Sequence, residues 1–319
     1  MSETENPVDT VVRLLQKEMQ VIKDDNSMAK VHVSSEWCDR ELFRSCDTQI
    51  TVGLAESRDT KIEMSGRLRR RLATLRVNVW SQNRQIRNKA VEEVNRVVRQ
   101  NRNCPNETTY TFFNVNQTTN THKTYSTCSM EEPNPEDTSW TEIANADYEK
   151  LWYSDDDRYQ KSTNINDEYA LMLFRFKIES RENTVKKIVL AFEGYGTAPA
   201  GNGVTIKVWN HVAGAWQNSA SGTGEADETI TITLTSNWTD YIDDDGYVWL
   251  IAKTTNPSDG ATQAILHCDY VSCTITVNGI THLDIVSFRD ADRVDIKPFI
   301  YRTEFALKSW LFEEITSTF

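Results

Sequence analysis

The sequence lacks the short motifs that mark the commonest enzymes and nucleotide-binding proteins. It contains no GxSxG, HExxH, Walker or GxGxxG pattern. The glycine-rich stretch 194–203 falls between expected strands, and no helix follows it that would hold a phosphate. The five histidines are scattered along the chain, so their spacing indicates no metal site. We therefore expect a protein that is not an enzyme and that requires no cofactor.

Paired cysteines and long apolar runs are also missing. The six cysteines include no CxxC pair, so we expect free thiols in a reducing compartment rather than a zinc site. No segment approaches the roughly 18 consecutive apolar residues of a membrane span. The first residues, MSETENPVDT, have neither the basic nor the apolar region of a signal peptide. These features predict a protein made in the cytosol that does not contact a membrane.

Charge is spread unevenly along the chain. The net charge is -12, yet residues 131–273 alone hold twenty-four acidic and ten basic side chains. Residues 58–102 hold thirteen basic and only four acidic side chains. Such an asymmetry indicates two units with different surfaces.

An amphipathic strand and helix lie within the basic stretch. Residues 74–80 alternate between apolar and polar side chains, which is the period of a half-buried strand. Ser81 is placed to cap a following helix, whose valines fall on one side as far as Val98. Another helix is expected to begin at Pro7, with Asn6 as its cap.

From Glu168 to Val277 the sequence changes character. Six segments rich in β-formers alternate with turns of Gly, Asn, Asp, Ser and Pro, which is typical of an antiparallel sandwich or jelly roll. Residues 301–310 then alternate as residues 74–80 do, so the chain is expected to return to its first domain.

This return predicts an α+β fold class with an insertion. A small antiparallel sheet with packed helices would be formed by residues 1–130 plus 279–319. An all-β sandwich or jelly roll, residues 131–278, would interrupt it. Insertion is physically acceptable because the two ends of a sandwich can lie close together.

The order of elements resembles a known family. The segments PVDTVVRLLQKEMQVI, LRVNVW, IRNKAVEEVNRVV and YRTEFALKSW are similar to the tail terminator and neck proteins of long-tailed bacterial and archaeal viruses. The resemblance covers residues 1–115 and 280–319. It implies a tail-terminator-like fold and a homo-hexameric ring that terminates the tail tube and joins it to the head, with the insert projecting outward. The implied partners are the tail tube protein, head-tail connector proteins and viral DNA that passes through the lumen without sequence recognition. The protein would be assembled in the host cytoplasm and reside in the virion.

The basic residues of the host domain are candidates for contacts in such a ring. A DNA-associated role is an open alternative, although no aromatic residues are interleaved with these cations. The two tryptophans among the candidates are expected as exposed anchors or, alternatively, as cross-strand neighbours. The subunit-interface or lumen candidates are Arg67, Arg69, Arg70, Arg71, Arg76, Arg87, Arg96, Trp80 and Trp310.

The sandwich suggests a different function, that of a carbohydrate-binding or adhesive surface module. Aromatic rings on a sheet face can stack on sugars, although such rings more often fill or cover the core. The acidic run Asp243, Asp244 and Asp245 is expected to be a solvated turn, with a bound calcium ion as the alternative. The candidate glycan contacts are Trp209, Trp216, Trp238 and Tyr241.

Overall fold

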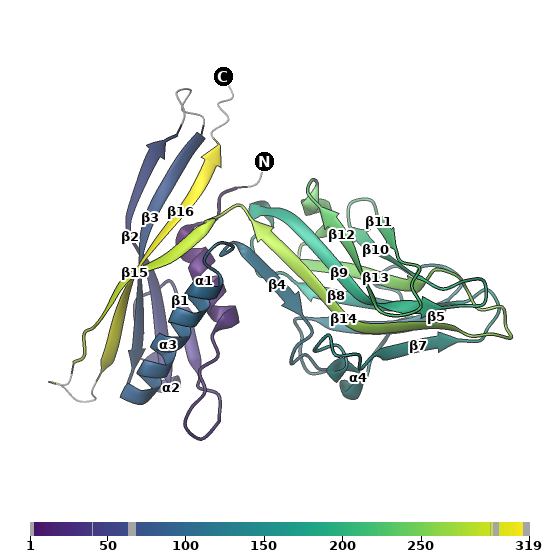
Figure 1. Ribbon diagram of the computed structural model, residues 1–319, viewed down its shortest axis with the longest axis horizontal. Coiled ribbons are helices and arrows are strands. Elements are labelled where there is room, and N and C mark those ends of the chain that lie inside the picture. The colour runs from purple at the N-terminus through teal and green to yellow at the C-terminus, as the bar shows by residue number, and fades with distance from the viewer. Residues whose placement is uncertain (1–2, 40, 63–67, 294, 296–299, 315–319) are drawn as a thin grey trace. The chain divides into compact units, whose positions relative to one another are not determined.

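The computed structural model describes residues 3–39, 41–62, 68–293, 295 and 300–314. The chain divides into two compact units, and each is described by itself (Figure 1). Unit 1 comprises Glu3–Thr108 and Val277–Phe319, and unit 2 comprises Thr109–Thr276. None of the helices in the described part of the chain is long and apolar enough to cross a membrane.

Unit 1 is built on a five-stranded sheet in the order β1-β2-β3-β16-β15. The strand β3 is central: it pairs antiparallel with β2 on one side and with β16 on the other, whereas β1 runs parallel to β2. Its elements are α1 (Pro7–Glu18), β1 (Val31–Ser34), α2 (Leu42–Ser45), β2 (Thr48–Lys61), β3 (Leu68–Ser81), α3 (Arg84–Gln100), β15 (His282–Asp290) and β16 (Tyr301–Glu314).

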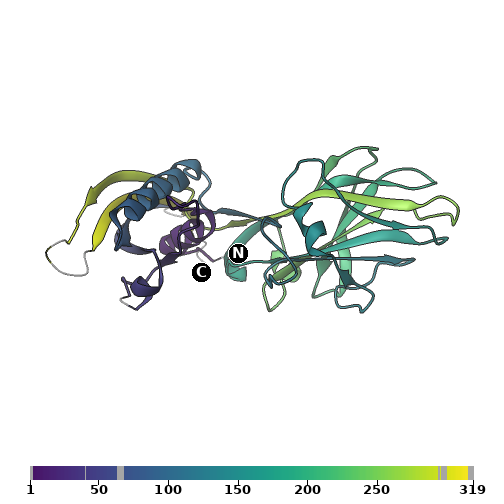
Figure 2. The same cartoon turned by 90° about the horizontal axis from the view of Figure 1, so that it is seen from below.

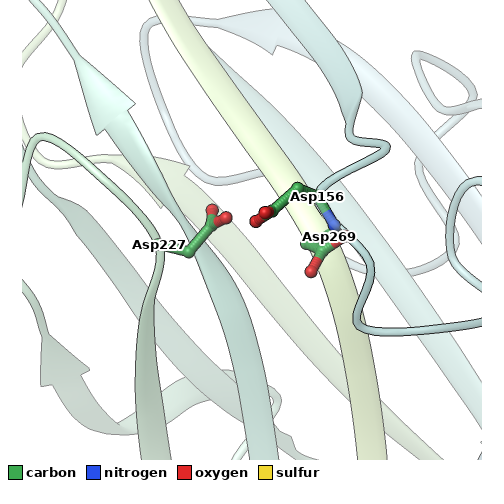
Figure 3. A group of neighbouring side chains, drawn as sticks. All are labelled: Asp156, Asp227 and Asp269. Carbon is green, nitrogen blue, oxygen red and sulfur yellow. Dashed lines mark hydrogen bonds between the residues drawn. The ribbon is translucent and has the colours of Figure 1, made fainter.

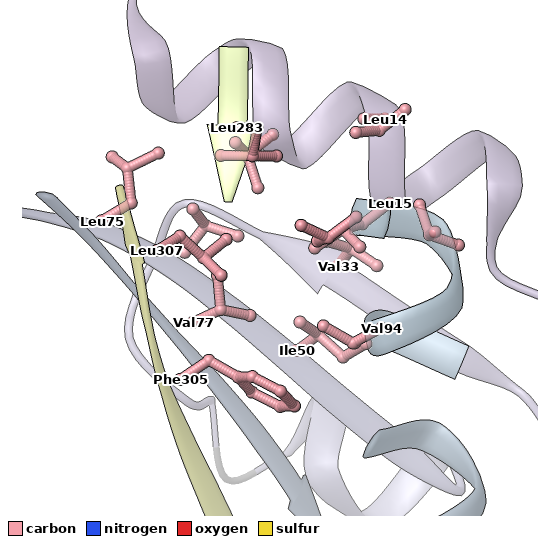
Figure 4. Packing of buried hydrophobic residues seen from close by; sticks show 14 of the residues in the cluster. Leu14, Leu15, Val33, Ile50, Leu75, Val77, Val94, Leu283, Phe305 and Leu307 are labelled. Carbon is pink, nitrogen blue, oxygen red and sulfur yellow. The ribbon is translucent and has the colours of Figure 1, made fainter. Parts of the chain in front are cut away.

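The core of unit 1 lies between the sheet and the apolar sides of α1 and α3 (Figure 4). Leu15 from α1 and Val94 from α3 are fully buried with Phe305 of β16. The side chain of Asn6 caps α1, because its Oδ1 accepts a hydrogen bond from the N–H of Val8 at 3.0 Å. The cap of α3 is Asn83 rather than the expected Ser81, which is the last residue of β3.

Unit 2 is a β-sandwich (Figure 2). One sheet has six strands in the order β11-β10-β13-β8-β5-β6, and the other has the order β12-β9-β14-β4 with β7 paired to β14. Its elements are β4 (Glu107–Thr111), β5 (Lys123–Ser129), β6 (Thr141–Glu142), α4 (Asn145–Glu149), β7 (Tyr159–Thr163), β8 (Tyr169–Lys177), η1 (Glu182–Thr184), β9 (Val185–Thr197), β10 (Val204–Asn210), β11 (Ala215–Ser221), β12 (Glu228–Leu234), η2 (Trp238–Tyr241), β13 (Tyr247–Thr254) and β14 (Ala264–Val277).

Aromatic rings fill the space between the two sheets of unit 2. Phe112 packs against Phe174 and Phe176, with ring centroids 5.9 and 5.2 Å apart, and all three rings are fully buried.

Two glycines of the stretch 194–203 lie on β9, where backbones approach closely. A Cβ atom at Gly194 would stand 2.1 Å from the carbonyl oxygen of His267, so this contact between strands needs glycine.

The predicted sandwich is confirmed, but the predicted fold class is wrong. The part of the chain that the structure describes is mostly β, with 47% in strands and 15% in helices, and its strands form three sheets rather than an α+β fold with packed helices of the tail-terminator kind. The clear apolar period of the helices favours a prediction with more helix than the structure has. The strands β2 and β3 each run for 14 residues, through polar stretches in which pairing with a neighbour, not side-chain alternation, maintains the strand.

The segment 109–130 also differs from the expectation that it belongs to the host domain. It falls in unit 2. The strand β5 pairs with β8 over seven residue pairs, from Lys123 opposite Arg175 to Ser129 opposite Tyr169. Pairing partners so far apart along the chain leave no local signal in the sequence.

Candidate functional site

Two tryptophans stand on the outer face of the six-stranded sheet. Trp249 of β13 lies between Val248 and Leu250, which are fully buried in the sandwich, so strand alternation turns its indole outward. Trp209 of β10 follows the fully buried Val208 in the same way. Val208 of β10 pairs with Leu250 of β13 in an antiparallel ladder. The next position of this ladder places Trp209 opposite Trp249. Both side chains are half-buried.

These two indoles line a hollow of about 520 Å³, here called the indole hollow. A loop before β6, the β10–β11 turn and the turn before β13 supply the rest of its wall. The remaining lining residues are Asn134, Pro135, Glu136, His211, Gly214, Asp243, Asp244 and Asp245.

The loop that forms one wall is fixed to the sheet at two points. The indole N–H of Trp216 donates to the carbonyl oxygen of Pro133 at 2.9 Å. Trp216 also packs edge-to-face on Trp209, with ring centroids 5.0 Å apart. Glu132 accepts hydrogen bonds from the ammonium groups of Lys207 and Lys253 at 2.7 and 2.8 Å. Burial opposes ionisation of Glu132, but these two lysines outweigh it and lower its pKa.

The acidic turn forms the opposite wall. The Oδ1 atom of Asp243 accepts from the backbone N–H of Asp245 at 3.0 Å and of Tyr247 at 2.7 Å, so this carboxylate shapes the turn itself. Gly246 completes the turn with a φ of +74°. Asp244 and Asp245 are exposed.

His211 lines the indole hollow between these walls. Burial lowers the pKa of its imidazole, against the opposing effect of the nearby carboxylates of Asp243, Asp244 and Glu136. Burial therefore favours the neutral imidazole, and the charge of the lining comes mainly from the carboxylates.

Two cations lie beside the aromatic rings on the same sheet face. The guanidinium of Arg175, which pairs with Trp249 across β8 and β13, lies 4.4 Å from the ring centroid of Tyr247 and 5.6 Å from that of Trp249. The ammonium group of Lys177 lies 4.8 Å from the Tyr247 centroid. These cation–π contacts hold the rings in place.

The structure separates the four predicted glycan-contact aromatics. Trp209 lines the indole hollow and Trp216 supports it. Trp238 lies in η2 and does not line the hollow. Tyr241 is buried, where its hydroxyl accepts from Asn218 at 2.6 Å and donates to Gln217 at 3.2 Å. The predicted candidates omitted Trp249, although strict alternation between Val248 and Leu250 places its ring on the outer face.

A separate group of carboxylates lies on unit 2 (Figure 3). One oxygen each from Asp156, Asp227 and Asp269 lies within 4.8 Å of the others, a separation that a calcium ion could bridge. Arg158 already supplies positive charge there, since it donates to Asp227 at 2.7 Å and to Asp156 at 2.8 Å. Asp269 is only 1% exposed, and burial raises its pKa. Within the described residues, the predicted calcium ligands Asp243, Asp244 and Asp245 form no such group.

A larger hollow of about 740 Å³ lies beside Arg158. Its lining is polar apart from Tyr159, which is 8% exposed and whose hydroxyl hydrogen-bonds that of Ser126 at 2.9 Å. No indole lines this hollow. The ring of Tyr159 is almost fully buried, so it offers a ligand little surface on which to stack.

The basic candidates of unit 1 are mostly engaged within the unit. On β3, Arg71 pairs with Asp59 at 3.0 Å and Arg76 pairs with Glu304 at 3.0 Å. The neighbouring Arg69 is half-buried and Arg70 is exposed. Arg67 lies outside the described residues.

On α3 the two candidate arginines differ. Arg87 is 1% exposed and donates to the hydroxyl of Thr303 at 2.6 Å, so it does not present its side chain to another subunit. Arg96 pairs with Glu93 at 2.6 Å and also donates to the carbonyl oxygen of Glu18 at 2.8 Å.

The two candidate anchors of unit 1 also have neighbours within the unit. Trp80 is 8% exposed rather than exposed as an anchor, and its indole N–H donates to Thr51 at 3.2 Å. Trp310 is half-buried and stacks on His282, with ring centroids 3.8 Å apart. The alternative expectation of cross-strand neighbours describes Trp310, because His282 is its partner on β15.

Comparisons with known proteins give weak likenesses. No curated protein matches the chain. Among solved structures, the xylan-binding module CBM15 is 13% identical, with a TM-score of 0.30 over 54% of this chain and 98% of that chain. The family 11 carbohydrate-binding module of the cellulosomal cellulase Lic26A-Cel5E of Clostridium thermocellum is 10% identical, with a TM-score of 0.22 over 55% of this chain and 89% of that chain. The enzymatically active domain of tailspike protein 4 of bacteriophage CBA120 is 10% identical, with a TM-score of 0.23 over 53% of this chain and 19% of that chain.

Likenesses this weak leave the function to be argued from the geometry of the indole hollow. A family model gives one further match, which runs from the loop before β5 to the end of β14. Residues 119–277 match the family described as AF_1625_C, uncharacterized protein, C-terminal domain.

Proposed function

We propose that unit 2 binds carbohydrate in the indole hollow. The observation that carries the proposal is that Trp209 and Trp249, side by side on an exposed sheet face, line a hollow of about 520 Å³ whose rim is polar. The flat indole face suits the C–H face of a sugar ring, and rim carboxylates suit its hydroxyl donors. A hollow of this size, in which two indoles are combined with polar groups, is of the kind that small ligands occupy.

The position of the two indoles supports a binding role over a purely structural one. The sandwich core is already filled by residues such as Phe112, Phe174 and Phe176. Trp209 and Trp249 face away from that core, and leaving indole surface open to water forfeits the free energy of burying it. The fixed loop at Pro133 and the packing of Trp216 hold the hollow in one shape before a ligand arrives.

The test is a glycan array with the full chain, followed by calorimetry on any saccharide that binds. Trp209→Ala and Trp249→Ala are each expected to weaken binding about tenfold, because a lost stacking contact amounts to about 1.5 kcal/mol. Trp238→Ala is the matched control, since Trp238 does not line the hollow. A folded protein that binds no saccharide, or binding indifferent to both hollow tryptophans, would contradict the proposal.

The ring-forming role in a virion neck stays a prediction for unit 1. The tail tube protein, the connector proteins and viral DNA likewise stay predicted partners of unit 1. Mass measurement by light scattering, and imaging of any assembly by electron microscopy, address it separately from sugar binding. A ring of about six copies would support it, as the symmetry of such assemblies requires.

A further inference from the structure

The rim of the indole hollow carries an excess of negative charge. Four carboxylates line it, those of Glu136, Asp243, Asp244 and Asp245. Burial lowers the pKa of His211, the basic residue of the lining, and so favours its neutral form. The side chains of Glu136 and Asp244 make no hydrogen bond or ion pair with any residue that the structure describes. They are therefore available to a ligand.

The nearby cations lie outside the lining of the hollow. The ammonium group of Lys177 donates to the backbone carbonyl oxygen of Asp245, and Arg175 lies over the rings of Tyr247 and Trp249. Lys207 and Lys253 share the carboxylate of Glu132. None of these four cations is part of the lining of the hollow. An anionic ligand would thus meet like charges, whereas a cationic ligand would meet opposite ones.

The arrangement of the carboxylates favours an organic cation over a metal ion. Oxygen atoms of Asp156, Asp227 and Asp269 converge within 4.8 Å, whereas those around the indole hollow form no such group among the described residues. A metal ion needs several oxygens around one point. Carboxylates spread around a hollow that two indoles line instead suit a ligand with a ring and with amines at separate positions.

We propose that the indole hollow selects sugars that carry a free, protonated amine, such as oligomers of glucosamine, over their N-acetylated and uronic-acid counterparts. This inference rests on the proposed function, since it names the sugar class that the same hollow takes. The sugar ring stacks on Trp209 or Trp249, while its ammonium group donates hydrogen bonds to Glu136 or Asp244. N-acetylation removes the charge, and a uronic acid reverses it.

Calorimetry with the full chain at low salt tests the proposal with three probes: glucosamine oligomers, the matched N-acetylglucosamine oligomers and oligogalacturonate. The amine form is expected to bind about tenfold more tightly than the acetylated form, because charged hydrogen bonds are stronger at a partly enclosed site than at an open surface. Oligogalacturonate is expected not to bind. The preference for the amine should shrink as salt rises.

A double variant isolates the rim charge. Glu136→Gln with Asp244→Asn is expected to reduce the affinity for the amine form about tenfold and to leave the acetylated form unchanged. Its matched control is Glu149→Gln with Glu225→Gln, which removes the same charge from two exposed positions outside the hollow. The control should retain the affinity, because the attraction is local and is not due to the net charge of -12.

The outcomes separate this inference from the proposed function. Equal or tighter binding of the acetylated oligomer, lost on Trp209→Ala, overturns amine selection and supports carbohydrate binding. Amine binding that survives Trp209→Ala and Trp249→Ala, or that falls equally in the control pair, also overturns it. Absence of binding to every saccharide overturns both proposals.

Discussion

Arg87 of α3 donates from Nη1 to the hydroxyl of Thr303 on β16 at 2.6 Å, although 216 residues separate the two. The arginine is 1% exposed, and its guanidinium also pairs with Asp290 and, at 3.6 Å, with Asp292. It therefore fastens the returning end of the chain onto the helix that precedes unit 2. A charge this deeply buried is tolerated only because these partners surround it.

Replacing Arg87 is expected to destabilise unit 1. Arg87→Ala should lower the free energy of unfolding by about 3 kcal/mol, the lower end for breaking a buried pair, because Asp290 is 55% exposed and can be solvated. Denaturant titration with probes in each unit measures it. Arg84→Ala, an exposed position on the same helix, is the control and should change little. A change of equal size at both positions would contradict the role of burial.

Arg87 also shows why the sequence could not yield the whole of unit 1. Periodicity predicted helix α3, and the strand expected at residues 301–310 lies within β16. The sequence predicts Arg87 as a candidate for contacts in a ring, because Thr303, to which it donates, lies 216 residues away and gives no local signal. Long-range pairs of this kind decide burial, and no local pattern records them. The same long-range pairing of strands decides the balance of helix and strand.

The sandwich was easier to predict than the site on it. Turn residues and strand alternation were sufficient for the sandwich, and alternation alone places Trp249 on an outer face. The indole hollow forms where the loop at Pro133 and the turn at Asp243 flank β10 and β13. Its lining residues come from separate parts of the chain. Composition pointed to aromatic side chains without showing which of them share a surface.

A change at the buried candidate Tyr241 should separate stability from binding. Tyr241→Phe removes hydrogen bonds to Asn218 and Gln217 and is expected to lower the free energy of unfolding by about 1 kcal/mol, without altering saccharide affinity. Thermal unfolding and calorimetry on one preparation measure both quantities. Weakened saccharide binding in folded Tyr241→Phe would show that the hydroxyl acts on the hollow from a distance.

The stability of unit 2 is expected to fall as the pH drops below about 6.5. His267 is 9% exposed and stacks on Tyr195, with ring centroids 4.2 Å apart. Burial lowers its pKa from 6.5, and the guanidinium of Arg158 lowers it further, while Asp227 acts in the opposite direction. The unfolded chain therefore takes up the proton at a higher pH than the folded chain does. Between those two pKa values, acidification favours unfolding.

The substitution His267→Gln tests this pH dependence. Urea titrations between pH 8 and 5.5 should give a flatter pH profile for the variant than for the natural chain. Some slope should remain, since burial lowers the pKa of His211 as well. The difference at pH 8, where both histidines are neutral, measures only the lost stacking. Parallel profiles would mean that His267 takes up its proton equally in both states.

Arg158 is expected to stabilise unit 2 by compensating buried carboxylates. It bridges Asp227, whose side chain is 13% exposed, and Asp156, next to the buried Asp269. Arg158→Ala leaves Asp227 and Asp269 without that counter-charge and should lower the free energy of unfolding by about 2 kcal/mol. This value is below that for a fully buried pair, because the arginine itself is 26% exposed.

A double variant shows whether charge or packing causes the loss at Arg158. If an uncompensated carboxylate is responsible, adding Asp227→Asn to Arg158→Ala should restore much of the stability, because the buried charge is then gone. If the loss comes from packing of the arginine stem, the second substitution should restore nothing. Lys150→Ala breaks the more exposed pair with Asp147 and serves as the control, with an expected change below about 0.5 kcal/mol. Denaturant titration at low and high salt then separates the two causes, since only the charge effect weakens as salt rises.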